Sequence, residues 1–495
     1  NGNIVGTIVE NIGTAPYVLE YEVIPNIAGL CSGNPEIFNL TVQPLPQTNF
    51  DLVDQTICNL TNSNTINLVS ATSAVDFIWT ATVPADVNGV NLSTDSTNNV
   101  PAYTLENTTA SPLTITIDAF AITQSGACQG ATNSASITII PTPIADTISS
   151  ITVCNNDQNP IIPLTGVATG YNWNNNNTST GILNSASNVL NFEAFNATNN
   201  GTAPINSTIT VTPLYQLNGT ICQGDNTSFS VTVNPTAQVN PISNIEVCNE
   251  DSINQIPFST NNTIGTTTYA WTNSNTAIGL SASGNGNIST FQGTNTSSTP
   301  ITATITVTPT FTHNGVQCTG ATETFTITVN PRPILNPITN QTICNNQVTS
   351  AINFVSAGAT DITWTNNLPS IGLASSGSGN IPPFTAINST NAAVTATITT
   401  TSFYNTNNLS CPGNTETFTI TVNPTPTVNT INNQIVCNND TTIAVTPTGN
   451  VAATNYTWSS SNTNIGLNAP TGNNLIPSFT AVNASNNIVS STITV

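Results

Sequence analysis

The chain has 495 residues and almost no basic side chains: one arginine, Arg332, one histidine, His313, and no lysine. Its 22 acidic residues give a formal net charge of −21 at pH 7. Contacts with nucleic-acid phosphates and with anionic lipid surfaces need clustered Lys and Arg, so this composition excludes both kinds of partner. No apolar run is long enough to span a bilayer, and we expect no membrane insertion within these residues.

Catalytic and metal-binding groups are also scarce. A single histidine without repeated partners builds no catalytic triad, and the segment around His313 is typical of a turn. Gly284–Gly286 is interpreted as a turn in an Asn/Ser-rich loop rather than a phosphate-binding loop. The ten cysteines include no Cys-x-x-Cys pair, which is not a zinc pattern. We therefore predict that the chain is not an enzyme and has no catalytic residues, no metal site and no required cofactor.

What the sequence has instead is a repeat. The motif Cys-Asn-Asn, or a close variant, recurs at intervals of 96, 94, 96 and 93 residues, at Cys58, Cys154, Cys248, Cys344 and Cys437. A fixed period marks a repeat array, and a period of about 95 residues suits one small domain per repeat.

Each repeat carries further marks at fixed places. A tryptophan follows the first cysteine by about twenty residues, at Trp79, Trp173, Trp271, Trp364 and Trp458. A second cysteine, with a glycine close behind it, follows the first by 67 to 70 residues, at Cys128, Cys222, Cys318 and Cys411. An alternating Thr/Val/Ile strand and a proline then close the repeat, as in 325–331 and 418–424.

These marks divide the chain into four whole repeats between two partial ones. We expect repeats at 44–140, 141–234, 235–330 and 331–423. Residues 1–43 match the C-terminal half of a repeat and contain Cys31, while 424–495 match the N-terminal part of another. We expect the chain to be part of a longer protein. The alternative is a filament subunit whose tail is completed by the head of the next subunit.

The composition favours an all-β fold. Strands such as 301–307 alternate apolar residues with Thr, which is the period-2 pattern of a half-buried strand. Asn, Gly and Pro fill the turns between them. Several short strands and one mid-repeat Trp per repeat favour a tandem array of immunoglobulin-like β-sandwiches, and short Pro-containing seams favour an extended rod. We expect the five tryptophans to be core residues, rather than the exposed platforms of a carbohydrate-binding array.

The regular cysteines indicate a disulfide framework and hence an oxidising compartment. Three pairings remain open. Bonds within each repeat would be Cys58–Cys128, Cys154–Cys222, Cys248–Cys318 and Cys344–Cys411. Bonds between neighbouring repeats would be Cys58–Cys222, Cys154–Cys318 and Cys248–Cys411. Sequential bonds, such as Cys128–Cys154, would join cysteines about 26 residues apart. The residues between them are expected to form two successive strands, so at ~3.3 Å per residue the two cysteines would lie tens of ångströms apart. Cys31 and Cys437 are expected to pair outside these residues or between chains.

Acidic residues recur just after the Cys-Asn-Asn motif. Asp157, Glu250, Asp251 and Asp440 stand there, while Gln347 takes the place in another repeat. A weak Ca²⁺ site is one interpretation, and a turn residue without a metal is the other.

The arrangement resembles the PKD-like (immunoglobulin-like) repeats of giant Bacteroidota surface adhesins and gliding-motility proteins of the SprB type. The resemblance covers the whole chain and depends on the Val/Ile-Cys-Asn-Asn opening, the mid-repeat Trp, the Asn-x-x-Gly-x-x-Cys-x-Gly hairpin of 314–320 and the closing strand. The usual Trp-Asp-Phe-Gly-Asp-Gly signature of PKD domains is missing, which places the chain in the looser PKD-like group.

This resemblance implies a non-enzymatic structural or adhesive stalk on a bacterial cell surface, exported by the type 9 secretion system. The implied partners are surface or polysaccharide ligands, copies of the chain itself, and the secretion and anchoring machinery. It also implies O-glycosylation at Asp-Ser/Thr motifs, for which the candidates are Ser96, Thr147, Ser252 and Thr441. An array attached to a secreted hydrolase is a further alternative.

Overall fold

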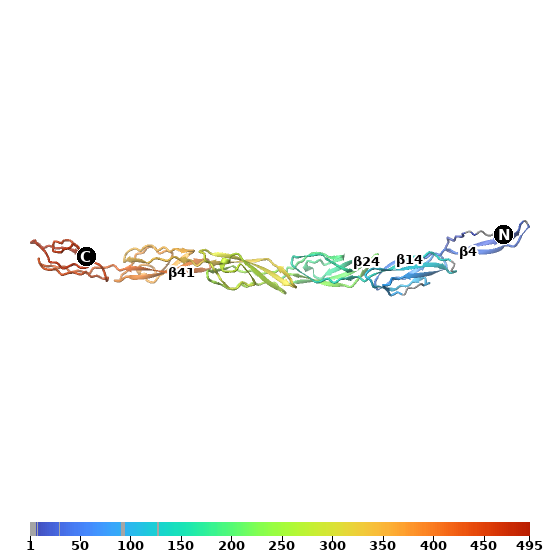
Figure 1. The fold of residues 1–495 in the computed structure, drawn as a ribbon, viewed down its shortest axis with the longest axis horizontal. Coiled ribbons are helices and arrows are strands. Elements are labelled where there is room, and N and C mark those ends of the chain that lie inside the picture. Colours follow the sequence, from blue (N-terminus) through green and yellow to red (C-terminus); the bar gives the residue numbers. More distant parts are fainter. Residues whose placement is uncertain (1–5, 7, 29, 91–94, 126–127) are drawn as a thin grey trace. The chain divides into compact units, whose positions relative to one another are not determined.

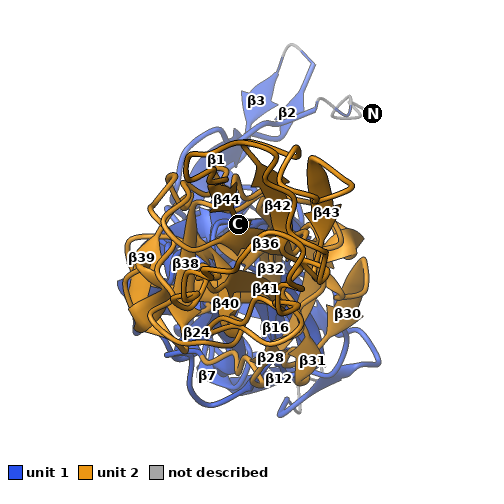
Figure 2. Ribbon diagram, turned by 90° about the vertical axis from the view of Figure 1, so that its left-hand side faces the viewer, with its two compact units in different colours: residues 1–238, 260–267, 309–321 blue, residues 239–259, 268–308, 322–495 orange. Residues whose placement is uncertain are grey.

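The computed structural model describes residue 6 and residues 8–28, 30–90, 95–125 and 128–495 (Figure 1). These residues form β-strands and three short 3-10 helices, with no α-helix among them. The prediction of an all-β fold is therefore confirmed. The chain divides into two compact units (Figure 2). Unit 1 contains residues 1–238, 260–267 and 309–321, and unit 2 contains 239–259, 268–308 and 322–495.

Unit 1 begins with two small hairpins. Strand β1 (Tyr17–Val23) pairs antiparallel with β4 (Glu36–Val42), and β2 (Asn26–Ile27) pairs with β3 (Cys31–Ser32). Most side chains of these strands are exposed, including Phe38.

The next part of unit 1, up to Ile140, is a β-sandwich around one core. Its main sheet has the order β6-β14-β13-β9, in which β6 runs parallel to β14 and the other pairs are antiparallel. Two three-stranded sheets, β11-β8-β5 and β10-β12-β7, contribute to the same core. The strands are β5 (Asn49–Phe50), β6 (Asp54–Cys58), β7 (Thr61–Asn62), β8 (Ile66–Val69), β9 (Val75–Thr82), β10 (Val87–Asn88), β11 (Asn99–Val100), β12 (Thr104–Asn107), β13 (Leu113–Thr123) and β14 (Asn133–Ile140).

Strand β13 shows why this sequence builds a sandwich. Ile115, Ile117, Ala119 and Ala121 alternate along it and are fully buried, while the residues between them face outward. Because side chains of a strand alternate between its faces, this pattern buries one face of the sheet and leaves Thr116, Asp118 and Phe120 half-exposed on the other.

A second sandwich in unit 1 repeats the arrangement up to Asn234. Its sheet has the order β16-β26-β24-β20-β21, with β25 paired to β24, and β16 again runs parallel to the last strand. The elements are β15 (Ile144–Ala145), β16 (Ile151–Cys154), β17 (Gln158–Asn159), β18 (Ile162–Pro163), β19 (Gly166–Val167), β20 (Gly170–Asn175), η1 (Thr178–Thr180), β21 (Ser185–Val189), β22 (Asn191–Phe192), β23 (Phe195–Asn196), β24 (Ile205–Leu217), β25 (Thr220–Gln223) and β26 (Thr227–Asn234). Unit 1 also contains the end of β32 (Ile301–His313), which pairs with β33 (Val316–Thr319), and the first residues of β29 (Thr266–Asn273).

Unit 2 contains two further cores of the same kind and a third, smaller one. The first two have main sheets β27-β34-β32-β29-β30 and β36-β41-β40-β38-β39. The first includes β27 (Ile245–Cys248), β28 (Ser252–Ile253), β29 (Thr266–Asn273), η2 (Thr276–Ile278), β30 (Ser283–Asn285), β31 (Phe291–Gln292), β32 (Ile301–His313) and β34 (Glu323–Asn330). The second includes β35 (Ile334–Leu335), β36 (Gln341–Cys344), β37 (Ser356–Ala357), β38 (Asp361–Asn366), η3 (Pro369–Ile371), β39 (Ser376–Ser378), β40 (Val394–Asn405) and β41 (Ser410–Asn423). The last sheet, β43-β42-β44, has β42 (Thr457–Ser460), β43 (Thr471–Asn473) and β44 (Ile493–Thr494).

Each of the five hydrophobic cores contains one tryptophan, and all five rings are at most 7% exposed. A glycine of the neighbouring strand lies against the ring in three of them. Gly284 packs on Trp271, Gly377 on Trp364 and Gly472 on Trp458, and a Cβ at any of these glycines would overlap the indole. Gly284 lies within β30 and not in the turn that we expected at Gly284–Gly286. Gly286 follows this strand and has the left-handed backbone of a turn.

Candidate functional site

The residues that recur most regularly meet where the Cys-Asn-Asn loop of one repeat faces a hairpin of the next. We call each of these places a junction. The first cysteine ends a short strand that runs parallel to the closing strand of its own repeat, so Cys154 lies opposite Asn234 and Cys248 opposite Asn330. This pairing carries the cysteine to the same end of the sheet as the closing proline.

The Cys-Asn-Asn motif forms a loop that its own side chains hold by hydrogen bonds. Asn155 Oδ1 accepts the backbone N–H of Asn199 at 2.7 Å, and Asn155 Nδ2 donates to Thr236 Oγ1 at 2.9 Å. Asn156 has a left-handed backbone with φ of 69°, which Asn tolerates better than most residues. Asp157 Oδ2 accepts the backbone N–H of Cys154 at 3.3 Å. The motif is thus explained by backbone geometry.

The hairpin that faces this loop carries the second cysteine. At the first junction the hairpin turns at Asn218 and Gly219, both with positive φ. Thr220 Oγ1 donates to the carbonyl of Thr56 at 3.1 Å, and Asn218 Nδ2 donates to Thr56 Oγ1 at 3.2 Å. These bonds hold the hairpin against the strand that ends in the first cysteine.

Three disulfides close the junctions. Unit 1 contains Cys58–Cys222 and Cys154–Cys318, and unit 2 contains Cys248–Cys411, with Cα–Cα distances of 5.5 to 5.6 Å. Each joins the first cysteine of one repeat to the second cysteine of the next, at a separation of 163 or 164 residues. Bonds within a repeat and sequential bonds are not what the structure contains. Cys31, Cys128, Cys344 and Cys437 are free.

The glycine two residues after the second cysteine lets the hairpin approach the start of its own repeat. A Cβ at Gly224 would overlap the carbonyl oxygen of Pro143, and a Cβ at Gly413 would overlap that of Pro333, both well under 3.0 Å. Gly320 and Gly130 make the same approach to backbone oxygens. Sterics therefore explain why a glycine follows each of these second cysteines: a side chain at that position would overlap the backbone.

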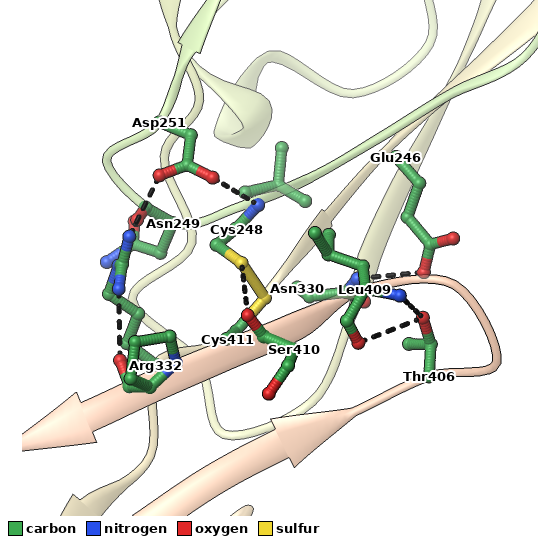
Figure 3. Close-up of a disulfide and its surroundings, with 12 residues drawn as sticks. Glu246, Cys248, Asn249, Asp251, Asn330, Arg332, Thr406, Leu409, Ser410 and Cys411 are labelled. Atoms are coloured by element: carbon green, nitrogen blue, oxygen red, sulfur yellow. Dashed lines mark hydrogen bonds and ion pairs between the residues drawn. A yellow bond between two sulfur atoms is a disulfide. The ribbon is translucent and has the colours of Figure 1, made fainter.

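Arg332 strengthens the junction in unit 2 (Figure 3). Its Nη2 forms an ion pair with Asp251 Oδ1 at 2.8 Å, its Nε donates to the carbonyl of Asn249 at 2.7 Å, and its Nη1 donates to the carbonyl of Pro412 at 3.0 Å. The single arginine thus bridges the Cys-Asn loop and the cysteine hairpin. The equivalent residues are Leu45, Thr142, Thr236 and Thr425, and the sequence alone did not assign Arg332 a role.

A buried asparagine behind each loop was also missed. Asn199 is 3% exposed, donates to the carbonyls of Ala203 and Val233 at 2.9 and 2.8 Å, and accepts from Gly201 N–H at 3.0 Å. Asn107, Asn295 and Asn388 are equivalent and also buried, whereas Asn483 has the same place in the last repeat but is only half-buried. Their recurrence at the interval of the cysteines was the signal available in the sequence.

The remaining candidates are the acidic residues after the Cys-Asn-Asn motif, His313 and the proposed glycosylation residues. Asp157, Asp251 and Asp440 accept the N–H of the cysteine three positions earlier, and Asp251 also binds Arg332. In the part of the chain that the structure describes, no three His, Cys, Asp or Glu side chains gather as a metal site. The backbone carbonyl of His313 accepts from Asn234 Nδ2 at 3.2 Å. The candidate glycosylation residues are all exposed: Ser96, Thr147, Ser252 and Thr441.

No protein-family model and no curated protein sequence matches the chain. Solved structures with a similar succession of β domains include the protocadherin GammaB4 extracellular domain, at 11% identity and a TM-score of 0.27, covering 83% of this chain and 72% of that one. The human desmocollin-1 ectodomain has 11% identity and a TM-score of 0.25, covering 90% and 95%. Sidekick-1 immunoglobulin domains 1–5 have 12% identity and a TM-score of 0.22, covering 85% and 98%. Similarity at this level assigns no function. No helix within the described ranges is long and apolar enough to cross a membrane.

Proposed function

We propose that the chain is a non-enzymatic stalk of an extracellular protein that bears tension along its length. The observation that carries this proposal is the interleaving of the three disulfides. Because each bond reaches into the next repeat, successive bonds overlap along the sequence and no repeat between Cys58 and Cys411 stands outside them.

The disulfides create a short covalent path through a long chain. A force that reaches Cys58 can pass by its disulfide to Cys222, follow the backbone to Cys248 and pass by the next disulfide to Cys411. That path contains only 26 backbone residues, against 353 along the uninterrupted chain. Much of it is already extended, in β26 and β27. Unfolding of the repeats would therefore hardly lengthen the chain between Cys58 and Cys411, because tension cannot separate these two cysteines by more than the length of this path.

The junction contacts support the same role. In unit 2 the disulfide lies beside the Arg332–Asp251 ion pair and the hydrogen bond from Arg332 to Pro412. In unit 1 the hydrogen bonds from Asn218 and Thr220 to Thr56 lie beside the disulfide Cys58–Cys222. Each junction thus combines a covalent bond with polar contacts that hold its two sides in one geometry.

Disulfides form and persist in oxidising compartments, so three of them favour an extracellular location. The resemblance to PKD-like repeats supports a finer proposal: a Bacteroidota cell-surface protein in adhesion or gliding, exported by type 9 secretion and built of domains at 44–140, 141–234, 235–330 and 331–423. The four exposed Asp-Ser/Thr motifs are its proposed glycosylation sites. Surface or polysaccharide ligands are the proposed partners.

One experiment tests location and disulfides together. Source cells are labelled with an antibody against the chain without permeabilisation, and the protein is isolated after immediate blocking of free thiols with iodoacetamide. We expect surface labelling and the peptide pairs Cys58–Cys222, Cys154–Cys318 and Cys248–Cys411 by mass spectrometry. Labelling only after permeabilisation, or blocked thiols at these six positions, would overturn the proposal.

A further inference from the structure

The three disulfides differ in how far their cysteines are exposed to solvent. The second cysteine is buried in each of them, at Cys222, Cys318 and Cys411. The first cysteine is half-buried in the two disulfides of unit 1, at Cys58 and Cys154. In the disulfide of unit 2 the first cysteine, Cys248, is only 2% exposed. A thiol in solvent therefore reaches Cys58 and Cys154 more readily than Cys248.

Arg332 joins the two sides of the unit 2 disulfide by bonds that do not involve sulfur (Figure 3). Its Nε donates to the carbonyl of Asn249, which follows Cys248, and its Nη1 donates to the carbonyl of Pro412, which follows Cys411. Both cysteines are thus held together through their own neighbours in the sequence. We call this bridge the arginine clamp.

Asp251 completes the arginine clamp. Its Oδ1 lies 2.8 Å from Arg332 Nη2 and neutralises the guanidinium, while its Oδ2 accepts the N–H of Cys248 at 3.1 Å. An unpaired cation beside a disulfide would attract an attacking thiolate and stabilise the leaving one, so it would favour exchange. The ion pair with Asp251 removes that attraction and keeps the restraint.

The two disulfides of unit 1 have a threonine at the place of the arginine. Thr236 Oγ1 accepts from Asn155 Nδ2 at 2.9 Å, and Thr142 Oγ1 accepts from Asn59 Nδ2 at 2.7 Å. Each threonine thus binds the asparagine beside the first cysteine, on one side of the disulfide. A single hydroxyl group cannot reproduce the three bonds that the guanidinium makes across the junction.

We propose that Cys58 and Cys154 are sites of attack by small thiols of the glutathione type, and that the arginine clamp protects the unit 2 disulfide from the same reaction. Such thiols open the two junctions of unit 1 and leave Cys248–Cys411 closed. The mechanical consequence rests on the proposed function. Under tension the chain between Cys58 and Cys248 lengthens, whereas the chain between Cys248 and Cys411 does not.

The reaction at Cys58 is thiol–disulfide exchange. A small thiolate attacks Cys58 Sγ, the Sγ–Sγ bond breaks, and Cys222 leaves as a thiolate that takes up a proton. A second small thiolate then attacks the sulfur of the first in this mixed disulfide, which releases Cys58 as a thiol and forms the oxidised dimer of the small thiol. The protein gains two electrons and two protons, and two small thiols are oxidised.

The order of reduction tests the proposal. The full chain, with its free thiols blocked by iodoacetamide, is incubated in native buffer with reduced glutathione, and samples are quenched at intervals with N-ethylmaleimide. Mass spectrometry of pepsin peptides gives the rate at which each disulfide is lost. We expect the two disulfides of unit 1 to be lost at least about tenfold faster than Cys248–Cys411, the factor that corresponds to one hydrogen bond from a charged group.

Arg332→Thr tests the clamp directly, because it installs the residue of the unit 1 junctions. In this variant Cys248–Cys411 should be lost about as fast as Cys154–Cys318, and the rate for Cys154–Cys318 should not change. Circular dichroism checks that the variant is folded. In a denaturing concentration of guanidinium chloride the three disulfides should be lost at similar rates, and an order of loss that persists there would overturn the proposal.

Two reciprocal substitutions transfer the arginine to unit 1. Thr236→Arg should slow the loss of Cys154–Cys318, because Asp157 stands three residues after the first cysteine, as Asp251 does in unit 2. Thr142→Arg is the matched control. Thr61 stands there in place of the acid, so this arginine has no carboxylate partner and should protect its disulfide less.

The outcomes separate this inference from the proposed function. Equal rates for the three disulfides in the folded chain would overturn the inference, and so would an Arg332→Thr variant as resistant as the wild type or a Thr236→Arg variant without added protection. In each case the disulfides are present and the proposed function stands. Free thiols at all six positions before any treatment would overturn the proposed function instead.

Discussion

Reduction of the disulfides is expected to change how far the chain can be stretched. With all three bonds intact, the shortest covalent path from Cys58 to Cys411 contains 26 residues and extends to about 90 Å at 3.3–3.6 Å per residue. After reduction the path contains 353 residues and extends to roughly 1,200 Å. The expected gain in contour length is thus about 1,100 Å.

Single-molecule pulling with handles at the two ends measures this gain directly. The free thiols are blocked first, and force–extension curves are recorded before and after addition of a phosphine reductant. The double variant Cys248→Ser/Cys411→Ser provides a graded control, because its shortest path, through Cys58–Cys222 and Cys154–Cys318, grows by 135 residues, or roughly 470 Å. If the oxidised wild-type chain already unfolds to the full contour length, the proposed path does not carry the force.

Four smaller perturbations test the cores and the junctions, with stability measured by chemical denaturation. Trp271→Ala should cost about 3–5 kcal/mol, the usual range for a buried aromatic, and a cost below 1 kcal/mol would contradict its place in the core. Gly413→Ala should destabilise the protein by more than Gly379→Ala. The new Cβ at position 413 would overlap a backbone carbonyl oxygen, whereas that at position 379 meets open space and costs only the backbone strain of a positive φ, about 1 kcal/mol. Equal losses of stability would refute the steric argument. Asn199→Ala should cost about 1–3 kcal/mol by leaving a buried carbonyl without a donor, and a neutral result would show that water replaces the side chain. Burial, and then the nearby Asp146 carboxylate, raise the pKa of the Tyr171 hydroxyl in the folded protein. Above a pH of about 10 unfolding therefore releases a proton, and the stability should fall as the pH rises. With free thiols blocked, Tyr171→Phe should lose less stability over this pH range than the wild type.

The all-β fold and the buried tryptophans could be predicted because they depend on local pattern. Alternation of apolar residues and Thr marks a strand wherever it occurs, and the position of Trp271 within such a strand indicates a core side chain. The repeat interval then transfers each assignment from one copy to the next.

The disulfide pairing could not be settled from the sequence, because it depends on which strands are neighbours. Spacing alone allowed Cys248 to pair with Cys318 or with Cys411. The structure decides between them because β27 runs parallel to β34, which carries Cys248 to the end of the sheet away from the hairpin of its own repeat. Parallel pairing of two distant segments leaves no local mark in a sequence.

The roles of Arg332 and Asn199 were missed for a related reason. Both act through hydrogen bonds to backbone carbonyls, and any residue has such a carbonyl, so the sequence does not identify their partners. The bond from Arg332 to Pro412 joins residues 80 positions apart. A lone basic residue in a chain of this composition looks like an exception, yet the structure places it where the Cys-Asn loop and the cysteine hairpin meet.

The strands on the short covalent path are arranged so that tension loads them along their length. Between Cys222 and Cys248 the path follows β26, which is hydrogen-bonded to β16 on one side and β24 on the other, and then β27, which is bonded to β34. Hydrogen bonds in a sheet lie roughly across the strands, so a pull along a strand strains several of them together and does not break them one at a time. The parallel pairing that carries each first cysteine to its junction therefore also places the loaded strand inside a sheet. The same feature of the fold accounts for the position of the disulfides and for the resistance to extension that we expect from them.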